Sequence, residues 1–128
     1  MLEPDQFSTN EAWVVFQLNE LPIRTEQDGD FNCVALMDAA SGFIMGTVFV
    51  AVGETEPCAF EIRRLFKSGL ARGHRQPDSL FVPKGQFPVI LPAEAARQGI
   101  TVVPVHESEL SAFIGAAKRG FREHVQGA

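Results

Sequence analysis

The feature that most constrains the fold is a pair of long apolar segments separated by only four residues. Residues 31–38 read FNCVALMD, residues 43–52 read FIMGTVFVAV, and the link between them is AASG. Both segments are rich in β-branched and other apolar residues, which favours strands. A four-residue link can join two strands as a hairpin, with Gly42 taking the positive φ that ends such a turn. The sequence therefore predicts an antiparallel strand pair.

Segments on both sides extend this pair into a larger sheet. AWVVFQL at residues 12–18 predicts an earlier strand, and Asp28-Gly29-Asp30 is a strong turn signal before the hairpin. After the hairpin, helix and strand patterns alternate, and such crossovers imply parallel pairing. We therefore expect an α/β fold with a mixed five-stranded sheet, three antiparallel strands followed by parallel ones, and helices on both faces. The alternating segments are residues 54–69, 80–82, 92–98, 100–105 and 107–125.

Capping signals define the predicted helices. In the first, Glu56 is expected near the positive end of the helix dipole, Pro57 in the first turn and Gly69 at the C-terminal cap. In the second, Pro92 is expected at the first position and Gly99 just past the end.

Length and composition indicate one domain with its own core. The chain has 128 residues, of which 45% are hydrophobic, and we divide it into an N-terminal extension at 1–11 and a domain at 12–125. The apolar runs are too short for a membrane span, and the acidic, polar start is not a secretory signal. Cys33 and Cys58 are expected to be reduced and buried rather than joined in a disulfide, as in a cytoplasmic protein.

Charge is distributed unevenly along the chain. Residues 1–56 carry ten acids and one base, whereas residues 57–128 carry ten bases and six acids. Such asymmetry can mark a nucleic-acid-binding face, and two differently charged surfaces of one domain are the alternative. Six bases fall within 22 residues, and phosphate contacts by them would give salt-sensitive binding, unless they form a solvated helix face and loop. These candidate nucleic-acid-binding residues are Arg63, Arg64, Lys67, Arg72, Arg75 and Lys84.

The ordered run of motifs over residues 12–123 resembles the catalytic core of the integrase and DDE-transposase family, which has a ribonuclease H-like fold. AWVVF matches the family's first strand, VALMDAASGFIMG its hairpin, and CAFEIRRLFKSGL its next helix. LFVPKGQF matches the strand end that bears the second acid, AARQGITVV the segment after it, and SAFIGAAKRGF the last helix. No single motif is specific, and the order of all of them carries the resemblance.

The resemblance also implies where the family's chemistry would be found. Three carboxylates in that family hold two divalent cations, which clamp the attacking and leaving oxygens of a phosphodiester. Here the first position falls at Phe16, the second at Pro83 and the third near Ser111 or Ala112. None is a carboxylate, so the resemblance implies a core without catalytic residues, bound metal or other cofactor. Lys84 could place a cation where the metal charge would be, or be an exposed lysine in a turn.

Asp38 is the carboxylate nearest in the sequence to this constellation, and we group it with the degenerate-site positions Phe16, Pro83 and Ser111. A local role is favoured for it, with its oxygens accepting from the N–H groups of Ala40 or Ser41 in an Asx-turn. The alternative is a displaced metal site that combines it with other acids. Those acids are Asp78, Glu107 and Glu109, the two glutamates otherwise serving as dipole partners in the first turn of the last helix.

Other reaction chemistry has little support in the sequence. The three histidines show no metal-ligand spacing, and no phosphate loop, dinucleotide fingerprint or serine-nucleophile motif is present. We therefore expect a non-catalytic, integrase-core-like interaction module that binds nucleic acid or a protein partner. Pairing of two copies through helices is a rival use of its surface. The alternative function is a divalent-metal-dependent nuclease or strand transferase with displaced carboxylate ligands.

Overall fold

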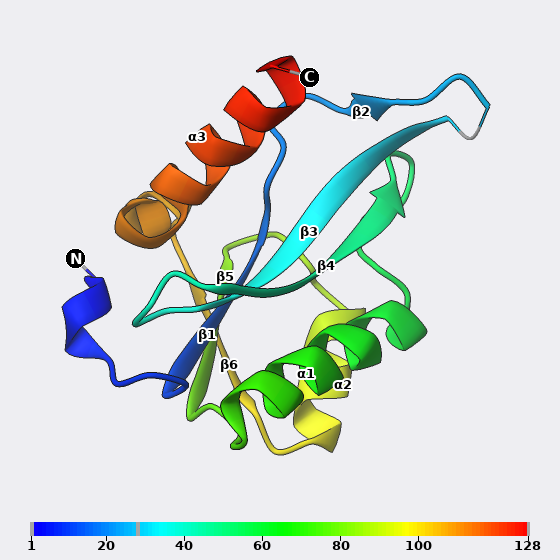
Figure 1. Ribbon diagram of the computed structural model, residues 1–128. Coiled ribbons are helices and arrows are strands. Elements are labelled where there is room, and N and C mark those ends of the chain that lie inside the picture. The colour runs from blue at the N-terminus through cyan, green and yellow to red at the C-terminus, as the bar shows by residue number, and fades with distance from the viewer. Residues whose placement is uncertain (1, 28, 128) are drawn as a thin grey trace.

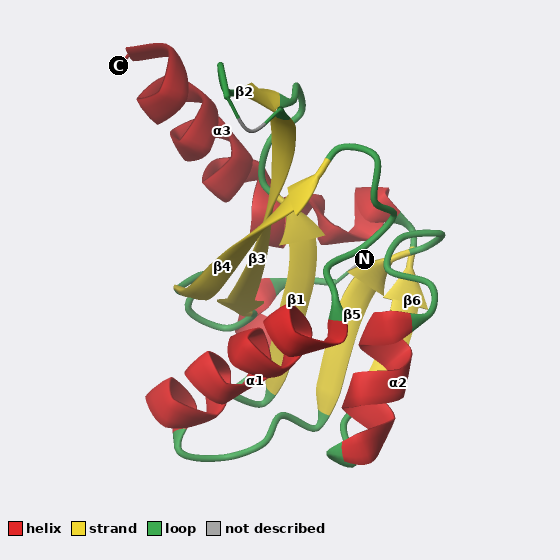
Figure 2. Ribbon diagram, turned by 90° about the vertical axis from the view of Figure 1, so that its right-hand side faces the viewer, coloured by secondary structure: helices red, strands yellow, loops and turns green. Residues whose placement is uncertain are grey.

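The computed structural model describes residues 2–27 and 29–127, with side chains as far as Glu123. These residues form one mixed sheet with helices on both faces (Figures 1 and 2), as predicted. The strands are β1 (Ala12–Gln17), β2 (Ile23–Arg24), β3 (Asp30–Asp38), β4 (Ile44–Ala51), β5 (Ser79–Pro83) and β6 (Thr101–Val105). The helices are α1 (Ala59–Gly73), α2 (Ile90–Arg97) and α3 (Ser111–Gly127), with short 3-10 turns η1 (Pro4–Gln6) and η2 (Glu107–Leu110).

Strand β3 organises the antiparallel half of the sheet. It pairs with β1 and β2 along one edge and with β4 along the other, always antiparallel. Beyond β1 the sheet continues through β5 and β6, both in parallel pairing. The predicted five strands are confirmed. The two-residue β2, which pairs only with the start of β3, was not predicted.

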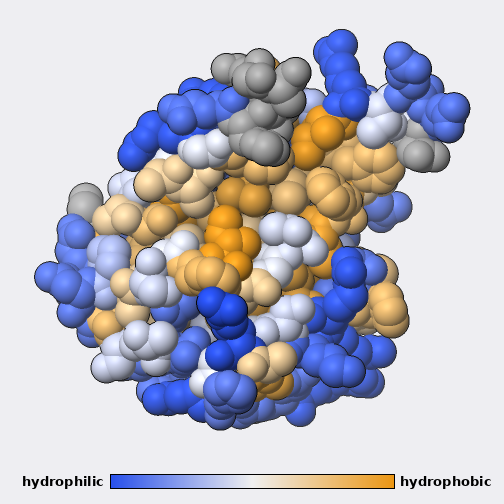
Figure 3. Space-filling model, viewed as in Figure 1, coloured by the Kyte–Doolittle hydropathy of each residue, from blue (hydrophilic) through white to orange (hydrophobic). Residues whose placement is uncertain are grey.

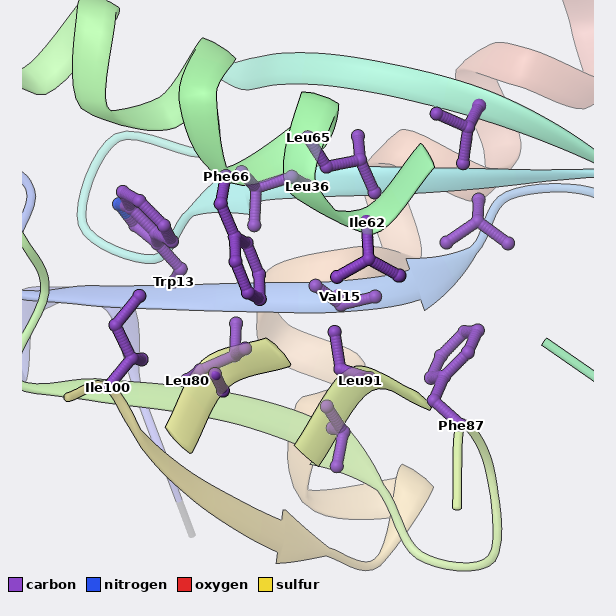
Figure 4. Close-up of a cluster of buried hydrophobic side chains, with 14 of the residues drawn as sticks. Trp13, Val15, Leu36, Ile62, Leu65, Phe66, Leu80, Phe87, Leu91 and Ile100 are labelled. Carbon is purple, nitrogen blue, oxygen red and sulfur yellow. The ribbon is translucent and has the colours of Figure 1, made fainter. Parts of the chain in front are cut away.

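Alternation along β1 divides the core into two layers. Trp13 and Val15 face α1 and α2, in the cluster that Figure 4 shows, whereas Val14 and Phe16 face α3. The N-terminal segment belongs to the α3 layer, because the ring of Phe7 lies 5.6 Å from that of Phe81. The residues before β1 therefore pack onto the core.

The structure corrects the predicted ends of α1. The helix begins at Ala59 rather than residue 54 and continues through Gly69 to Gly73, where His74 adopts the left-handed conformation (φ 59°). Gly69 is therefore inside the helix and does not cap it. Cys58 lies just before α1 and is exposed, so its predicted burial was wrong. Both cysteines are free, and burial raises the pKa of the Cys33 thiol.

Glu56 caps a different helix from the one expected. Its carboxylate accepts hydrogen bonds from the backbone N–H groups of Val89, Ile90 and Leu91, at 2.8, 2.9 and 2.9 Å. These groups open α2, so a residue that precedes α1 in the sequence stabilises the start of the neighbouring helix. Glu94 of α2 binds Arg63 of α1 through both carboxylate oxygens, at 3.0 and 3.1 Å. Helix α2 is thus held both by the segment before α1 and by α1 itself.

The outer strands of the sheet, β4 and β6, differ in composition. The N–H of Lys84 donates to the carbonyl of Val105 at 2.8 Å, so by alternation the backbone of Pro104 faces away from β5. Its missing N–H therefore costs no bond within the sheet. Strand β4 has neither proline nor a charged residue, and its Phe49 side chain is 60% exposed.

Candidate functional site

The C-terminal ends of β1 and β5 bring two of the predicted degenerate-site positions together. Val14 pairs with Phe81 in parallel register, so Phe16 and Pro83, two residues further along each strand, lie at the same end of the sheet. A cavity of about 250 Å³ opens at this end of the sheet. Its lining residues are Phe16, Gln17, Asn19, Glu20, Pro83, Gln86, Glu107 and Lys118.

An ion pair lies beside Phe16 and Pro83 in this cavity. The Nζ atom of Lys118 is 2.8 Å from Oε1 of Glu107, and the Lys118 side chain is only 20% exposed. As a site residue, Glu107 was considered only as a ligand of a displaced metal site, and Lys118 was not predicted as a site residue. The signal was present, because Lys118 follows Ile114 by four residues and precedes Phe121 by three, and both belong to the apolar stripe of α3. Lys84 is exposed in a turn and does not line the cavity, in agreement with the second of its two predicted roles, and the base that lines the cavity is Lys118.

Asp38 lies at the other end of the sheet, so grouping it spatially with Phe16 and Pro83 was wrong. It pairs with Trp13 at the beginning of β1, because β3 runs antiparallel to β1. Its carboxylate accepts from the N–H and Oγ of Ser41, at 3.1 and 2.6 Å, and from the N–H of Asn10 at 2.8 Å. The predicted local role is thus found with Ser41, and Asp38 also anchors the segment before β1.

The third expected position also lies outside the cavity. Ser111 is exposed at the first residue of α3, and its Oγ donates to the carbonyl of Ser108 at 2.9 Å. Ala112 is exposed and does not line the cavity. Of the acids that line the cavity, Glu107 is the closest in sequence to the expected third position, and it is paired with Lys118.

The acids considered for a displaced metal site do not converge. Asp78 precedes β5, at the same end of the sheet as Asp38, and pairs with Arg75 at 3.2 Å. Glu107 lies at the opposite end, in the cavity. Within residues 2–27 and 29–127, no three His, Cys, Asp or Glu side chains gather to hold a metal ion. His74 and His106 are exposed, and the side chain of His124 lies outside the described residues.

Solved structures with the same arrangement of elements come from integrases and transposases. The chain of a simian T-cell lymphotropic virus intasome in complex with the PP2A regulatory subunit B56 gamma matches 99% of this chain with a TM-score of 0.56 and 12% identity. The catalytic domain of Mos1 mariner transposase matches 88% of it with a TM-score of 0.57 and 12% identity. The HTLV-2 integrase catalytic core domain, in complex with magnesium and in dimeric form, matches 85% with a TM-score of 0.51 and 11% identity.

The chain has the ribonuclease H-like fold of the integrase and transposase catalytic cores. This integrase-like core spans 43% of the intasome chain, 60% of the Mos1 domain and 82% of the HTLV-2 domain. At these identities the likeness concerns the fold. No model of a known protein family matches the sequence, and a search of curated proteins found no match either.

Three of the six candidate bases form ion pairs with acids of the same chain. Arg63 pairs with Glu94 and Arg64 with Glu61. The Arg63 guanidinium lowers the pKa of the Glu94 carboxyl through hydrogen bonds, partly opposed by burial of that carboxyl. Arg75 pairs with an acid in the same way, whereas Lys67 is exposed.

The six candidate bases do not lie at one end of the sheet. Arg72, near the end of α1, stacks over the ring of Phe43 with 4.0 Å between its Cζ atom and the ring centroid. It and Arg75 lie before β5, whereas Lys84 follows β5 at the opposite end of the sheet.

A second cavity of the integrase-like core, of about 380 Å³, adjoins the first on the α3 face. It lies between the segment that leads from β1 into β2 and the C-terminal half of α3, which run beside each other in Figures 1 and 2. The two cavities share Asn19, Glu20 and Lys118. The lining residues of this second cavity are Leu18, Asn19, Glu20, Leu21, Pro22, Ile23, Arg24, Lys118, Phe121 and Arg122.

No described helix has the length and apolar character needed to cross a membrane.

Proposed function

We propose that this integrase-like core is a non-catalytic domain that binds a partner protein. The observation that carries the proposal is the position of Phe16 and Pro83, at the ends of β1 and β5, in the lining of one cavity. At these positions the family resemblance expects two carboxylates. A phenyl ring and a proline ring offer no oxygen ligand from their side chains to a hard divalent cation. The scaffold is retained without the ligands that its relatives' chemistry requires.

The ion pair in the same cavity supports this reading. The ammonium group of Lys118 already satisfies Glu107, at 2.8 Å. A divalent cation entering the cavity would meet a positive charge that is mostly shielded from water, and like charges repel more strongly where solvent screening is weak. The Lys118 ammonium group therefore disfavours binding of a metal ion in this cavity.

The contacts of the six candidate bases favour a protein partner over nucleic acid. Three of these bases are arginines that pair with acids of the same chain, and a fourth arginine stacks on Phe43. To bind phosphates, these arginines would have to give up their present contacts, and the net charge of −5 on the chain would repel a nucleic acid. Exposed apolar side chains, by contrast, are abundant on the surface, among them Leu21, Phe49 and Phe60 at 79, 60 and 67%.

Two of the similar structures involve further protein chains. One intasome is in complex with the PP2A regulatory subunit B56 gamma, and the HTLV-2 core is dimeric. A protein partner, or a second copy, is in keeping with these examples.

Catalysis is tested with the intact chain and divalent metals. Wild-type protein is incubated with supercoiled plasmid and millimolar Mg²⁺ or Mn²⁺, and its thermal unfolding is recorded across the same metal concentrations. We expect no nicking and no metal-dependent rise in Tm. The Tm measurement reports on binding, because a metal ion that binds only the folded state must raise Tm. Two results together would refute the non-catalytic assignment and favour a displaced metal site. They are a rise in Tm that saturates with metal concentration, and Mn²⁺-dependent nicking that Glu107→Gln abolishes.

Nucleic-acid binding is tested separately by mobility shift. Wild-type protein and the Lys67→Glu/Lys84→Glu double variant, which alters exposed lysines at two distant points, are titrated into labelled duplex and single-stranded DNA. We expect no complex at physiological salt for either protein. A complex that survives this salt and weakens in the variant would replace the protein partner with a nucleic acid.

A further inference from the structure

The cavity between the β1–β2 segment and α3 combines an apolar wall with basic groups. Leu18, Ile23 and Phe121 form the core side of this wall, and all three pack in the α3 layer. Leu21 stands at the lip with 79% of its surface exposed. In the space-filling view (Figure 3), hydrophobic residues form a broad area across this face of the molecule, with hydrophilic residues around it. A volume of about 380 Å³ is enough for one or two large apolar side chains.

One wall of the cavity is fixed by a buried amide. The Asn19 side chain, in a residue only 6% exposed, donates to the carbonyl of Leu21 and to Oδ1 of Asn32, both at 2.9 Å. Its own Oδ1 accepts from the N–H of Cys33 at 2.7 Å. Gln17 adds a hydrogen bond to the Asn19 carbonyl at 2.7 Å. The chain that carries Leu21 is therefore held in place before any partner arrives, which reduces the entropy cost of binding.

The cavity has a positive net charge, whereas the whole chain has a negative one. Three bases and one acid line it, and Glu107 of the adjoining cavity pairs with one of these bases, so the group has a net charge of +1 on a chain of net charge −5. Arg122 is 4.0 Å from Glu20, and Lys118 is paired with Glu107. Arg24, exposed in β2, forms no ion pair with a described residue. An anionic partner complements this rim, whereas a second copy would bring the same basic rim against it.

We propose that this cavity is the docking site for a short acidic segment of a partner protein that inserts a large apolar side chain. The apolar side chain fills the space between Leu21 and Phe121, and acidic side chains next to it approach Arg24. The proposal builds on the partner-binding part of the proposed function and names the class of partner.

The test uses a fluorescein-labelled synthetic peptide with a central leucine–phenylalanine pair flanked by aspartates. Two comparison peptides replace the aspartates by lysines or the central pair by glycine and serine. Binding to the full chain is followed by fluorescence polarisation, and the site is mapped by amide chemical shifts. We expect saturable binding of the first peptide alone, with shifts at residues 18–24 and 118–122.

Two variants and a matched control locate the site. Arg24→Glu, an exposed change that leaves the core intact, is expected to weaken binding about fivefold, in the range of a surface charge pair. Phe121→Ala is expected to weaken it about tenfold, as for an apolar anchor contact. Lys67→Glu is the same kind of charge reversal on α1, across the sheet, and is expected to leave the affinity unchanged.

Several outcomes would overturn the proposal. They are absence of binding, equal binding of the lysine peptide, equal effects of Arg24→Glu and Lys67→Glu, and displacement of the peptide by single-stranded DNA. None of them bears on metal-dependent cleavage, so the docking site and the non-catalytic assignment fail separately.

Discussion

Gly69 of α1 lies directly against Trp13 of β1, with no space between them for a side chain. A Cβ atom at Gly69 would be 2.7 Å from Cζ2 of Trp13 and 2.9 Å from Cδ2 of Leu36. Both neighbours are fully buried, so neither can move aside easily. Glycine here allows α1 to approach the sheet closely over the largest side chain of the core.

We therefore expect Gly69→Ala to destabilise the protein, although alanine is the better helix former. Overpacking of this kind should lower the free energy of unfolding by about 2–3 kcal/mol. Gly120 of α3 is the matched control, because nothing lies within 4 Å of a Cβ there. Gly120→Ala should raise the free energy of unfolding by roughly 0.5–1 kcal/mol. Urea denaturation measures both, and equal effects of the two substitutions would contradict the packing argument.

The Glu56 carboxylate should contribute to stability through α2. In Glu56→Gln one oxygen becomes an NH₂ group that faces the backbone donors of Val89, Ile90 and Leu91. We expect a loss of about 1–2 kcal/mol in the free energy of unfolding. Glu54→Gln, an exposed change two residues earlier, should have little effect. Hydrogen exchange should show faster opening at the amides of residues 89–91 in the Glu56 variant, and unchanged protection there would show that the cap is dispensable.

The Arg63–Glu94 pair should make stability depend on pH. Arg63 lowers the pKa of Glu94 in the folded protein, so the ionised carboxylate favours folding. Its contribution is fully present above the unfolded-state pKa of about 4.3 and is lost as the pH falls through the lower folded-state pKa. The difference in urea midpoint between the wild type and Glu94→Gln should therefore shrink between about pH 6 and about pH 3. A difference that stays constant over this interval would mean that the pair does not contribute through its charge.

Asp38 should behave as a structural residue. Asp38→Ala removes the acceptor for Asn10 and for both groups of Ser41, and we expect a loss of about 2–3 kcal/mol in the free energy of unfolding. Asp30→Ala, an exposed change at the start of β3, is the control and should have a small effect. Neither variant should alter the response of Tm to Mg²⁺ or Mn²⁺. A metal response that vanished only with Asp38→Ala would identify it as a ligand instead.

Local signals were enough to predict most of the fold. The four-residue link between residues 38 and 43 left only a hairpin, and the later alternation of strand and helix left parallel pairing. Strand β2 could not be predicted, because two residues become a strand only through pairing with Phe31 and Asp30. The end of α1 was misplaced because a glycine after an apolar stripe resembles a cap, whereas Gly69 is needed for contact with Trp13.

The candidate site was predicted only in part. Phe16 and Pro83 could be placed together from the parallel order of their strands. Asp38 could have been excluded from them, because a hairpin strand antiparallel to β1 must end where β1 begins. The Lys118–Glu107 contact spans 11 residues and a change from 3-10 turn to α-helix, so helical periodicity indicates where Lys118 points but not which acid it meets.

The outer strands β4 and β6 differ in their ability to pair with an added strand. On the β6 border, Pro104 has no N–H group to offer an incoming chain, so a continuous ladder is interrupted there. The β4 border presents an uncharged, proline-free segment of eight residues. We therefore expect an added strand to pair with β4. Such a strand could come from a bound peptide or from another copy of the chain under denaturing stress.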